Sequence, residues 1–324
     1  MRKIILDFPQ QFEQGLELAR QIKVEGKFDN VIVSGMGGSA WPAEILATWL
    51  DLPIQVNRNY QLPPQATKKT LAIFSSYSGN TEEPLAAYQE AIKKGLTMAA
   101  ITSGGQLKEL CQQNNTPLVE IPSGLIPRMA TGYIFTALYS ILANSDLKIK
   151  GRSSEILEMA KNLKPATQEN QGKELAQKLK GKIPIIYVSD KLKVLGYIWK
   201  IKFNESSNSP AFIHHFPELN HNELEGMAHE KECDFHKQSI FHCLILKDSQ
   251  DHPRIQKRMD LTAEILNETG LPTEIIDLTG QTLLEKLFSS ILLADWTSYY
   301  LAQEYKVDPL KTETIEEFKE KMRK

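Results

Sequence analysis

Cysteine is scarce in this chain of 324 residues, which has only three: Cys111, Cys233 and Cys243. An odd and sparse set of cysteines does not suit the disulfide framework that stabilises small secreted domains. We therefore expect reduced thiols that are mostly buried, and a cytoplasmic location fits this composition best. The opening segment, residues 1–7, has too short an apolar stretch for a secretory signal.

The chain also has no large excess of positive or negative charge and no long apolar run. The formal net charge is −2, so no overall positive field would attract nucleic acid or an anionic membrane surface. No uninterrupted apolar run approaches the length needed to cross a bilayer. With 41% hydrophobic and 24% charged residues, the composition is typical of a soluble globular protein. The length predicts a substantial core and about two domains.

Strand and helix patterns alternate along the first half of the chain. The segments predicted as strands are 31–33, 53–56, 70–74, 97–102 and 117–121, and those predicted as helices include 84–94 and 131–144. This alternation is typical of a mainly parallel sheet with helices on both faces.

A second α/β unit follows a helical connection. Residues 147–179 contain two helical patterns on either side of Pro165 and no strand. The elements predicted after them lie at 183–189, 192–204, 211–212, 240–246, 252–268, 273–278 and 283–304. The sequence therefore predicts two doubly wound α/β subdomains, residues 1–150 and residues 151–324, the second including the connection.

A run of hydroxyl side chains follows the third predicted strand. Ser76, Ser78 and Thr81 lie in the turn before the next helix, with Gly79 between them. Main-chain N–H groups at a helix start carry partial positive charge and bind anions, and the three hydroxyls add donors. Because the turn lacks the Lys of a nucleotide-binding P-loop, it indicates a phosphomonoester site. An ordinary serine-rich helix cap is the alternative.

A glycine-rich turn, residues 34–40, also lies between a strand and a helix. Gly35, Gly37 and Ala40 match the dinucleotide-binding pattern G-x-G-x-x-[GA]. Arg58, after the next strand, could suit a 2′-phosphate, so an NADP-dependent enzyme is one alternative and plain packing of a tight turn is another. Ligands of doubly wound sheets bind at the carboxyl ends of strands, so both turns can face one crevice.

The two turns together resemble the sugar-isomerase (SIS) domain, whose loops hold a sugar phosphate. Further segments narrow the resemblance to the bifunctional phosphoglucose/phosphomannose isomerase family: 127–133 (Pro-Arg-Met-Ala-Thr-Gly-Tyr), 204–205 (Asn-Glu), 220–224 (Asn-His-Asn-Glu-Leu), 308–309 and 315–319. The match spans nearly the whole chain. It implies two SIS-type subdomains per subunit, a sugar phosphate substrate, and a homodimer with active sites at the subunit interface.

The resemblance also implies catalytic roles. Moving a carbonyl between C1 and C2 of a sugar requires a base that takes the weakly acidic C2 proton and returns it at C1 through an enediol or enediolate. Glu205 would be this base, His221 would open the sugar ring, and Arg128 would stabilise the developing negative charge. We expect glucose 6-phosphate and fructose 6-phosphate to interconvert, and mannose 6-phosphate to react as well. Neither a metal ion nor a nucleotide cofactor is required.

The remaining site positions are also implied by the resemblance. A lysine near the C-terminus is placed at Lys319, with Lys311 as an alternative. Tolerance of the mannose epimer is linked in this family to a threonine, for which Thr312 is the candidate. The other substrate-binding residues are Gly38, Ser39, Ser76, Ser78 and Thr81, and the last four of these hold the phosphate.

Histidines and cysteines in the second half make a metal site a further alternative. His229, Cys233 and His236 have the spacing H-x3-C-x2-H, which is not a standard zinc arrangement. His242 and Cys243 fall in a predicted buried strand, where packing accounts for them. We therefore predict no metal site.

Other readings of the site residues stay open. Glu205 and Lys319 could be solvated helix residues, and His221 could be a turn histidine. Arg128 could form a surface ion pair. A non-catalytic sugar-phosphate sensor is the main functional alternative, because SIS domains also occur in transcription regulators. Such regulators normally carry a helix-turn-helix module, and the segment before residue 30 has room for one helix and no basic reading head.

Overall fold

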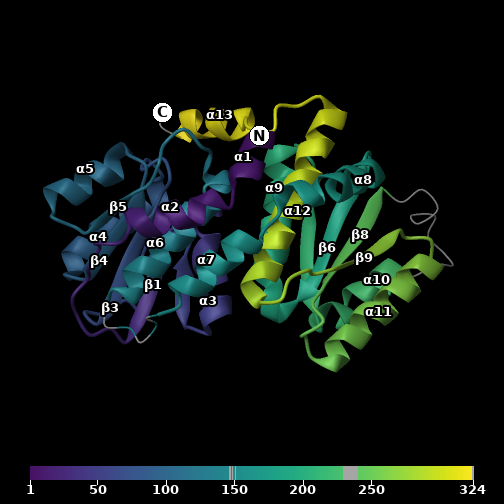
Figure 1. Ribbon diagram of the computed structural model, residues 1–324, viewed down its shortest axis with the longest axis horizontal. Helices are drawn as coiled ribbons and strands as arrows, with labels where there is room; N and C mark the ends of the chain where they lie inside the picture. The colour runs from purple at the N-terminus through teal and green to yellow at the C-terminus, as the bar shows by residue number, and fades with distance from the viewer. Residues whose placement is uncertain (146, 148, 150, 229–239, 323–324) are drawn as a thin grey trace. The chain divides into compact units, whose positions relative to one another are not determined.

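The computed structural model describes residues 1–145, 147, 149, 151–228 and 240–322 (Figure 1). It contains two compact units, which we call the N-terminal unit (Leu6–Leu163) and the C-terminal unit (Met1–Ile5 with Lys164–Lys324). The boundary predicted from the sequence lies between residues 150 and 151, whereas this division counts helix α7 (Ser153–Asn162) with the N-terminal unit. No helix of the described residues is long and apolar enough to cross a membrane.

A parallel sheet of five strands forms the centre of the N-terminal unit, in the order β2-β1-β3-β4-β5. The strands are β1 (Asn30–Ser34), β2 (Ile54–Asn57), β3 (Thr70–Ser75), β4 (Thr97–Thr102) and β5 (Leu118–Glu120). β3 is buried along its whole length, as expected for a central strand of a parallel sheet covered on both faces. The predicted mainly parallel sheet is confirmed in this unit.

Helices cover both faces of this sheet (Figure 1). α4 (Glu82–Lys94) and α5 (Gly105–Gln113) pack on one face, where the rings of Phe74 and Tyr88 meet edge to face with centroids 5.1 Å apart. α6 is buried at every position because the sheet, α2 and α3 surround it. The helices concerned are α2 (Gln10–Leu18), α3 (Trp41–Leu50) and α6 (Thr131–Ala143). The sequence did not predict α5.

The C-terminal unit has a parallel sheet of four strands in the order β7-β6-β8-β9. The strands are β6 (Ile183–Ser189), β7 (Phe212–Phe216), β8 (Phe241–Lys247) and β9 (Thr273–Asp277). When β6 is matched with β1, this order repeats that of β2-β1-β3-β4 in the N-terminal unit. The predicted second α/β unit is therefore confirmed, and the two units share one strand order.

Helices flank this second sheet as well (Figure 1). α10 and α11 pack against a core cluster that includes Tyr187 and Ile245, while α9 and α12 cover the other face and α8 packs on α12. The helices are α1 (Arg2–Asp7), α8 (Glu169–Leu179), α9 (Lys193–Ser206), α10 (Glu223–Ala228), α11 (Pro253–Glu268), α12 (Leu283–Tyr305) and α13 (Glu313–Met322). Short 3-10 helices are η1 (Gly37–Ser39), η2 (Pro127–Met129), η3 (Pro165–Gln168), η4 (Asp190–Leu192) and η5 (Glu218–His221).

Two contacts explain how α8 is held. A Cβ on Gly172 would lie 2.4 Å from the Cβ of Trp296, so only glycine lets α8 approach α12 this closely. The guanidinium of Arg2 donates to both carboxylate oxygens of Glu169 at 2.7 Å, which joins the start of the chain to α8. Residues 1–5 belong to the same unit as α8.

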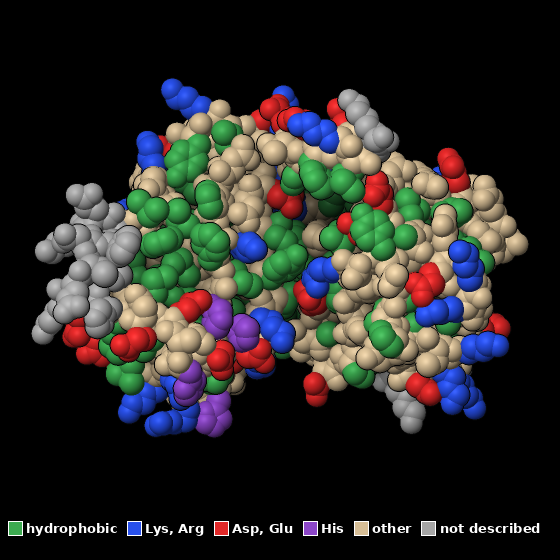
Figure 2. Space-filling model, turned by 180° about the vertical axis from the view of Figure 1, so that it is seen from behind, with side chains coloured by type: hydrophobic (Ala, Val, Ile, Leu, Met, Phe, Trp, Pro, Cys, Tyr) green, Lys and Arg blue, Asp and Glu red, His purple; other side chains and the backbone are tan. Residues whose placement is uncertain are grey.

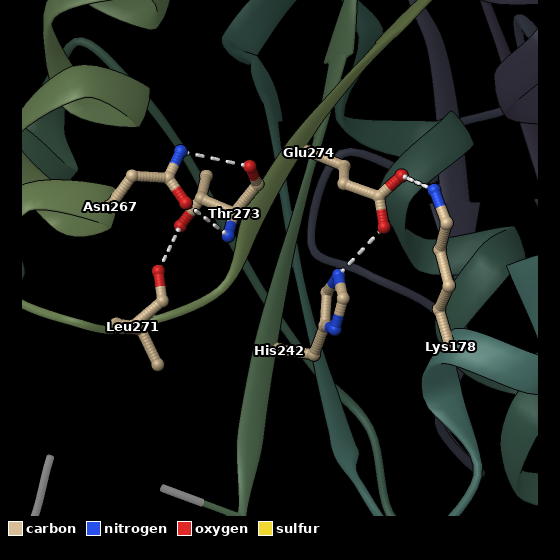
Figure 3. Close-up of polar contacts among 6 residues, drawn as sticks. All are labelled: Lys178, His242, Asn267, Leu271, Thr273 and Glu274. Atoms are coloured by element: carbon tan, nitrogen blue, oxygen red, sulfur yellow. Dashed lines mark hydrogen bonds and ion pairs between the residues drawn. The ribbon is translucent and has the colours of Figure 1, made fainter. Parts of the chain in front are cut away.

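A polar chain links β8, β9 and α8 (Figure 3). Nε2 of His242 lies 3.0 Å from one carboxylate oxygen of Glu274, and Nζ of Lys178 lies 2.5 Å from the other. Burial lowers the pKa of His242, and the neighbouring Glu274 carboxylate opposes this effect. The strand therefore carries a titratable group at a buried position.

The carboxyl end of β8 carries an internal charge pair. Asp248 is 1% exposed and one of its carboxylate oxygens lies 2.5 Å from Nζ of Lys286 on α12. Burial raises the pKa of the nearby Asp251. When the two sheets are matched strand by strand, β8 corresponds to β3, so the carboxyl end of β8 corresponds to the serine turn that follows β3.

Candidate active site

The serine turn after β3 brings two predicted phosphate-binding hydroxyls together. The Oγ of Ser76 lies 2.9 Å from Oγ1 of Thr81 and accepts a hydrogen bond from the main-chain N–H of Gly79 at 3.1 Å. Gly79 has φ +72°, and a Cβ there would lie 1.8 Å from the carbonyl oxygen of Gly104. Glycine is therefore required for the turn to close in this way.

Ser78 occupies the exposed side of the same turn, where its Oγ accepts a hydrogen bond from the N–H of Asn80 at 3.3 Å. Thr81 is the residue before α4, and its side chain makes no capping bond to the first turn of that helix. The N-terminal end of α4 and the hydroxyls thus lie at one place, which is the arrangement expected for anion binding.

The glycine-rich turn after β1 is tied to the serine turn. Oγ of Ser39 accepts a hydrogen bond from the main-chain N–H of Tyr77 at 3.0 Å, and Ser39 is 5% exposed. The two turns follow β1 and β3, which are neighbours in the sheet. The structure therefore brings Ser39 to the serine turn, at the carboxyl ends of the strands.

Arg128 joins this group through its main chain. A Cβ on Gly38 would lie 2.7 Å from the N atom of Arg128 and 2.6 Å from the carbonyl carbon of Pro127. Only glycine allows so close an approach, which is a physical reason for Gly38 in the motif. Arg128 is 2% exposed, so the alternative of a surface ion pair does not apply to it.

Glu205 lies in the last turn of α9 and lines a pocket of about 690 Å³ within the C-terminal unit. The pocket is also lined by Lys311 and Thr312, which follow α12 by several residues. Three residues that the sequence singled out are therefore brought together, although Glu205 is more than a hundred positions from the other two in the chain. Lys311 Nζ also lies 3.5 Å from the carboxylate of Glu313, another lining residue.

Lys319 and His221 are not among the residues that line this pocket. Lys319 is on α13, where Nζ lies 2.6 Å from the carboxylate of Glu316. His221 is exposed at the end of η5. The neighbouring Asn220 is anchored, since its amide donates to Oγ1 of Thr262 at 2.8 Å. The roles of His221 and Lys319 remain predictions.

Sequence reasoning missed two contributors to these sites. Tyr77 supports the serine turn: its hydroxyl donates to the carbonyl of Pro122 and accepts from the N–H of Leu125, both at 2.8 Å. Burial raises its pKa, so it stays a neutral anchor at neutral pH. Lys306 lines the Glu205 pocket with a left-handed φ of +56° at the end of α12. A non-glycine residue in this conformation has no clear signal in the sequence.

The geometry around Arg58 does not favour the NADP-dependent alternative. The guanidinium of Arg58, considered for a 2′-phosphate, donates to both carboxylate oxygens of Glu44 at 3.0 and 2.8 Å. An incoming phosphate would have to displace this carboxylate.

Histidines lie close together on one part of the C-terminal unit (Figure 2). The rings of His214 and His215 stack with centroids 5.3 Å apart, and Nε2 of His215 lies 3.3 Å from the carboxylate of Asp190. Within the described residues, no group of three or more His, Cys, Asp or Glu side chains is placed to hold a metal ion. His229, Cys233 and His236 lie outside the described residues.

The described cysteines, Cys111 and Cys243, are free and buried. Burial raises the pKa of the Cys111 thiol to about 11 and that of Cys243 to about 12. Both are therefore protonated, inert thiols at neutral pH. Their burial was predicted from the sequence.

Known proteins resemble this chain along its whole length. Residues 168–322 match the family model described as the bacterial phospho-glucose isomerase C-terminal SIS domain. The bifunctional phosphoglucose/phosphomannose isomerase of Caldicellulosiruptor bescii is 37% identical, over 99% of this chain and 98% of that relative. The protein of the same name from Aquifex aeolicus is 31% identical, also over 99% and 98%.

Solved structures agree on the fold. A hypothetical protein from Thermus thermophilus superposes with a TM-score of 0.75 and covers 98% of this chain and 89% of that chain, at 13% identity. An identity this low shows the shared fold alone. Together with the SIS family match and the two parallel sheets, it confirms the predicted SIS-type α/β fold.

Proposed function

The chain belongs to the bifunctional phosphoglucose/phosphomannose isomerase family, and we propose that it interconverts glucose 6-phosphate and fructose 6-phosphate and also accepts mannose 6-phosphate. The observation that carries this proposal is the similarity over 99% of the chain to two relatives with this name. Both relatives are named as enzymes, which favours turnover over the sensor alternative.

The substrate's phosphate binds the hydroxyl-rich turns of the N-terminal unit in this proposal. Ser76 and Thr81 already converge at 2.9 Å, and Ser39 joins them through the N–H of Tyr77. Ser78 is exposed and can turn toward a ligand. Hydroxyls and helix-start amides suit a dianion without a metal ion.

Proton transfer is the task of two side chains of the C-terminal unit. His221 donates a proton to the ring oxygen as the bond between C1 and that oxygen breaks, and it takes up the proton of the C1 hydroxyl, which opens the sugar to the aldehyde. Glu205 then removes the C2 proton, giving an enediolate with its negative charge on O1. The proton of the C2 hydroxyl moves to O1, and Glu205 returns its proton to C1 as the carbonyl forms at C2. Atoms and electrons balance within the substrate, so no redox cofactor takes part.

Positive charge stabilises the enediolate oxygen in this scheme. Arg128 and Lys319 supply it, with Lys311 as the alternative lysine, and Thr312 contacts the sugar near C2. Thr312 and Lys311 line the pocket that contains Glu205, which supports a substrate-facing position for both.

We also propose a homodimer that works in the cytoplasm. The dimer follows from the family resemblance, and the free, buried Cys111 and Cys243 suit a reducing compartment. Light scattering coupled to size exclusion would give the mass of the particle, and a monomer would contradict the dimer.

A coupled assay tests the reaction. Formation of fructose 6-phosphate from each aldose phosphate is followed with EDTA present, and we expect activity with both substrates. Glu205→Gln should lower kcat about 10²–10⁴-fold, the usual contribution of a general base, while sugar phosphate still binds. Activity that disappears with EDTA and returns with zinc would contradict the metal-free scheme.

Glu313→Gln is a matched control, because Glu313 is another carboxylate that lines the same pocket. This variant should keep kcat within a small factor of the wild-type value. Near-normal kcat in Glu205→Gln would exclude Glu205 as the base, and absence of activity in the wild-type protein with both aldoses would exclude the reaction itself.

A further inference from the structure

α9 and α12 are joined by two buried polar contacts as well as apolar packing. The indole N–H of Trp199 donates to Oγ of Ser290 at 3.0 Å, and Nζ of Lys202 lies 2.6 Å from Oδ1 of Asp295. The contact that lies further along α9 also lies further along α12. The helices therefore run parallel, and their C-terminal ends lie on the same side of the sheet.

These two helix ends build the Glu205 pocket. One wall is the end of α9 with the turn after it, residues 204–210, and the other is the segment after α12, residues 306–315. Lys202 is three residues before Glu205 and on the same helix face. Asp295 lies about three turns before the end of α12. One ion pair thus connects the helices that carry both walls.

The turn after Glu205 holds its shape through its own hydrogen bonds. The amide of Asn204 donates to the carbonyl of Ser209 at 3.1 Å, and the N–H of Ser209 donates to the carbonyl of Phe203 at 3.1 Å. Asn208 closes the turn with φ +50°. A movement of α9 along α12 would therefore shift Glu205 and this turn together relative to the other wall.

Stability alone is a weak explanation for the ion pair. The side chains of Lys202 and Asp295 are 1% and 3% exposed, so both charges are removed from water. Apolar residues of similar volume often replace such a buried pair without loss of stability. The neighbouring residues Trp199, Phe203 and Trp296 are fully buried, and they already supply apolar packing. A buried pair does, however, allow fewer relative positions of two helices than apolar contacts do.

We propose that the Lys202–Asp295 ion pair is a positioning device that fixes the register of α9 against α12 and so holds Glu205 at the correct place in its pocket. The proposal rests on the proposed role of Glu205 as the base. Neither Lys202 nor Asp295 touches the substrate in this proposal. Both act through Glu205, whose placement decides the rate of proton transfer.

The double variant Lys202→Met/Asp295→Leu tests the proposal, because it removes both charges and puts apolar side chains in their place. The matched control is Lys286→Met/Asp248→Asn, which removes another buried pair, near the start of α12. Thermal unfolding, kcat, KM and the kinetic isotope effect for glucose 6-phosphate deuterated at C2 are measured for both variants and the wild type.

The Lys202→Met/Asp295→Leu variant should unfold cooperatively at or above the wild-type temperature. We expect kcat to fall about 10- to 100-fold, because a base displaced by about 1 Å loses this much rate. KM should stay within a factor of about three, and the isotope effect should rise as proton transfer becomes slower. The Lys286→Met/Asp248→Asn control should keep the wild-type kcat and isotope effect.

Lys202→Arg provides a second test if the double variant does not fold. It keeps the charge, but its larger planar head cannot occupy the same space without moving α9. A wild-type kcat and isotope effect in the folded double variant, or in Lys202→Arg, would overturn the proposal. An inactive wild-type protein, or an active Glu205→Gln variant, would instead contradict the proposed function, so the two failures can be told apart.

Discussion

The side-chain oxygens of Ser76 and Thr81 lie 2.9 Å apart, and the same Ser76 oxygen accepts the N–H of Gly79. Two hydroxyls that are five residues apart in the chain are thus held at one point by a turn that only glycine can close. The loop is set before any ligand arrives, which lowers the entropic cost of binding an anion.

Ser76→Ala should weaken phosphate binding. Removal of one hydrogen bond to a charged group costs about 1.5–3 kcal/mol, so KM for glucose 6-phosphate should rise about 10- to 100-fold with little change in kcat. Inhibition by inorganic phosphate should weaken in parallel. The control is Ser103→Ala, which removes a 2.7 Å bond to the carbonyl of Tyr77 but no proposed phosphate ligand. An equal rise of KM in both variants would mean that the turn was merely loosened.

Gly38→Ala should reduce kcat at least about tenfold and destabilise the fold by about 1–3 kcal/mol, because the added methyl group pushes the main chain at Arg128 away. Gly95→Ala is the control: Gly95 has φ +63° but its Cβ would meet no atom within 4 Å. This substitution should cost about 1 kcal/mol of stability through backbone strain and leave kcat unchanged. Denaturant unfolding and steady-state kinetics distinguish the two effects, and a fully active Gly38→Ala would contradict the assignment.

Two single variants separate the candidate lysines. Lys319→Met should lower kcat more than about tenfold if this lysine stabilises the enediolate, whereas Lys311→Met should mainly raise KM because Lys311 lines the pocket. Both side chains are exposed and each has an acidic neighbour, so neither change should alter the unfolding temperature much. The reverse pattern of kcat and KM would transfer the charge-stabilising role to Lys311.

His242 should make stability depend on pH. Burial lowers its pKa in the folded state, so below the unfolded value of about 6.5 the unfolded chain binds a proton that the folded chain does not. The contribution of His242 to the free energy of unfolding is then fully present above this pH. It is lost as the pH drops toward the folded pKa, by at most about 1.4 kcal/mol per pH unit. His242→Gln should flatten urea-derived stability between about pH 7 and 5.

Glu274→Gln serves as the opposite change, because the Glu274 carboxylate raises the pKa of His242 against the effect of burial. Without this carboxylate the loss of stability at acid pH should become steeper. A wild-type profile that is already flat in this range would contradict the account.

Regular elements were predictable wherever their pattern was continuous. The apolar runs at 97–102 and 183–189 coincide with β4 and β6, since a buried parallel strand needs apolar residues on both faces. α5 was missed because it is short and buries only Leu107 and Cys111. β7 was predicted too short, because this edge strand carries a polar His-His pair and a half-exposed Phe212.

The candidate site was likewise predictable from the sequence only in part. The serine and glycine turns were readable from local chemistry, because each lies within one strand-to-helix connection. The pocket around Glu205 was not, since its walls come from segments that meet only when α9 packs parallel to α12. Lys202 and Asp295 have no local signature, and their partnership depends on this packing.

The carboxyl end of β8, where Asp248 and Lys286 neutralise each other, has a consequence for stoichiometry. The two halves repeat one strand order, yet a phosphate dianion arriving at this second location would meet a carboxylate and a lysine that is already neutralised. Duplicated architecture therefore does not give duplicated occupancy. We expect each polypeptide to saturate with a single sugar phosphate, which leaves its repeated half to specialise in acid–base work.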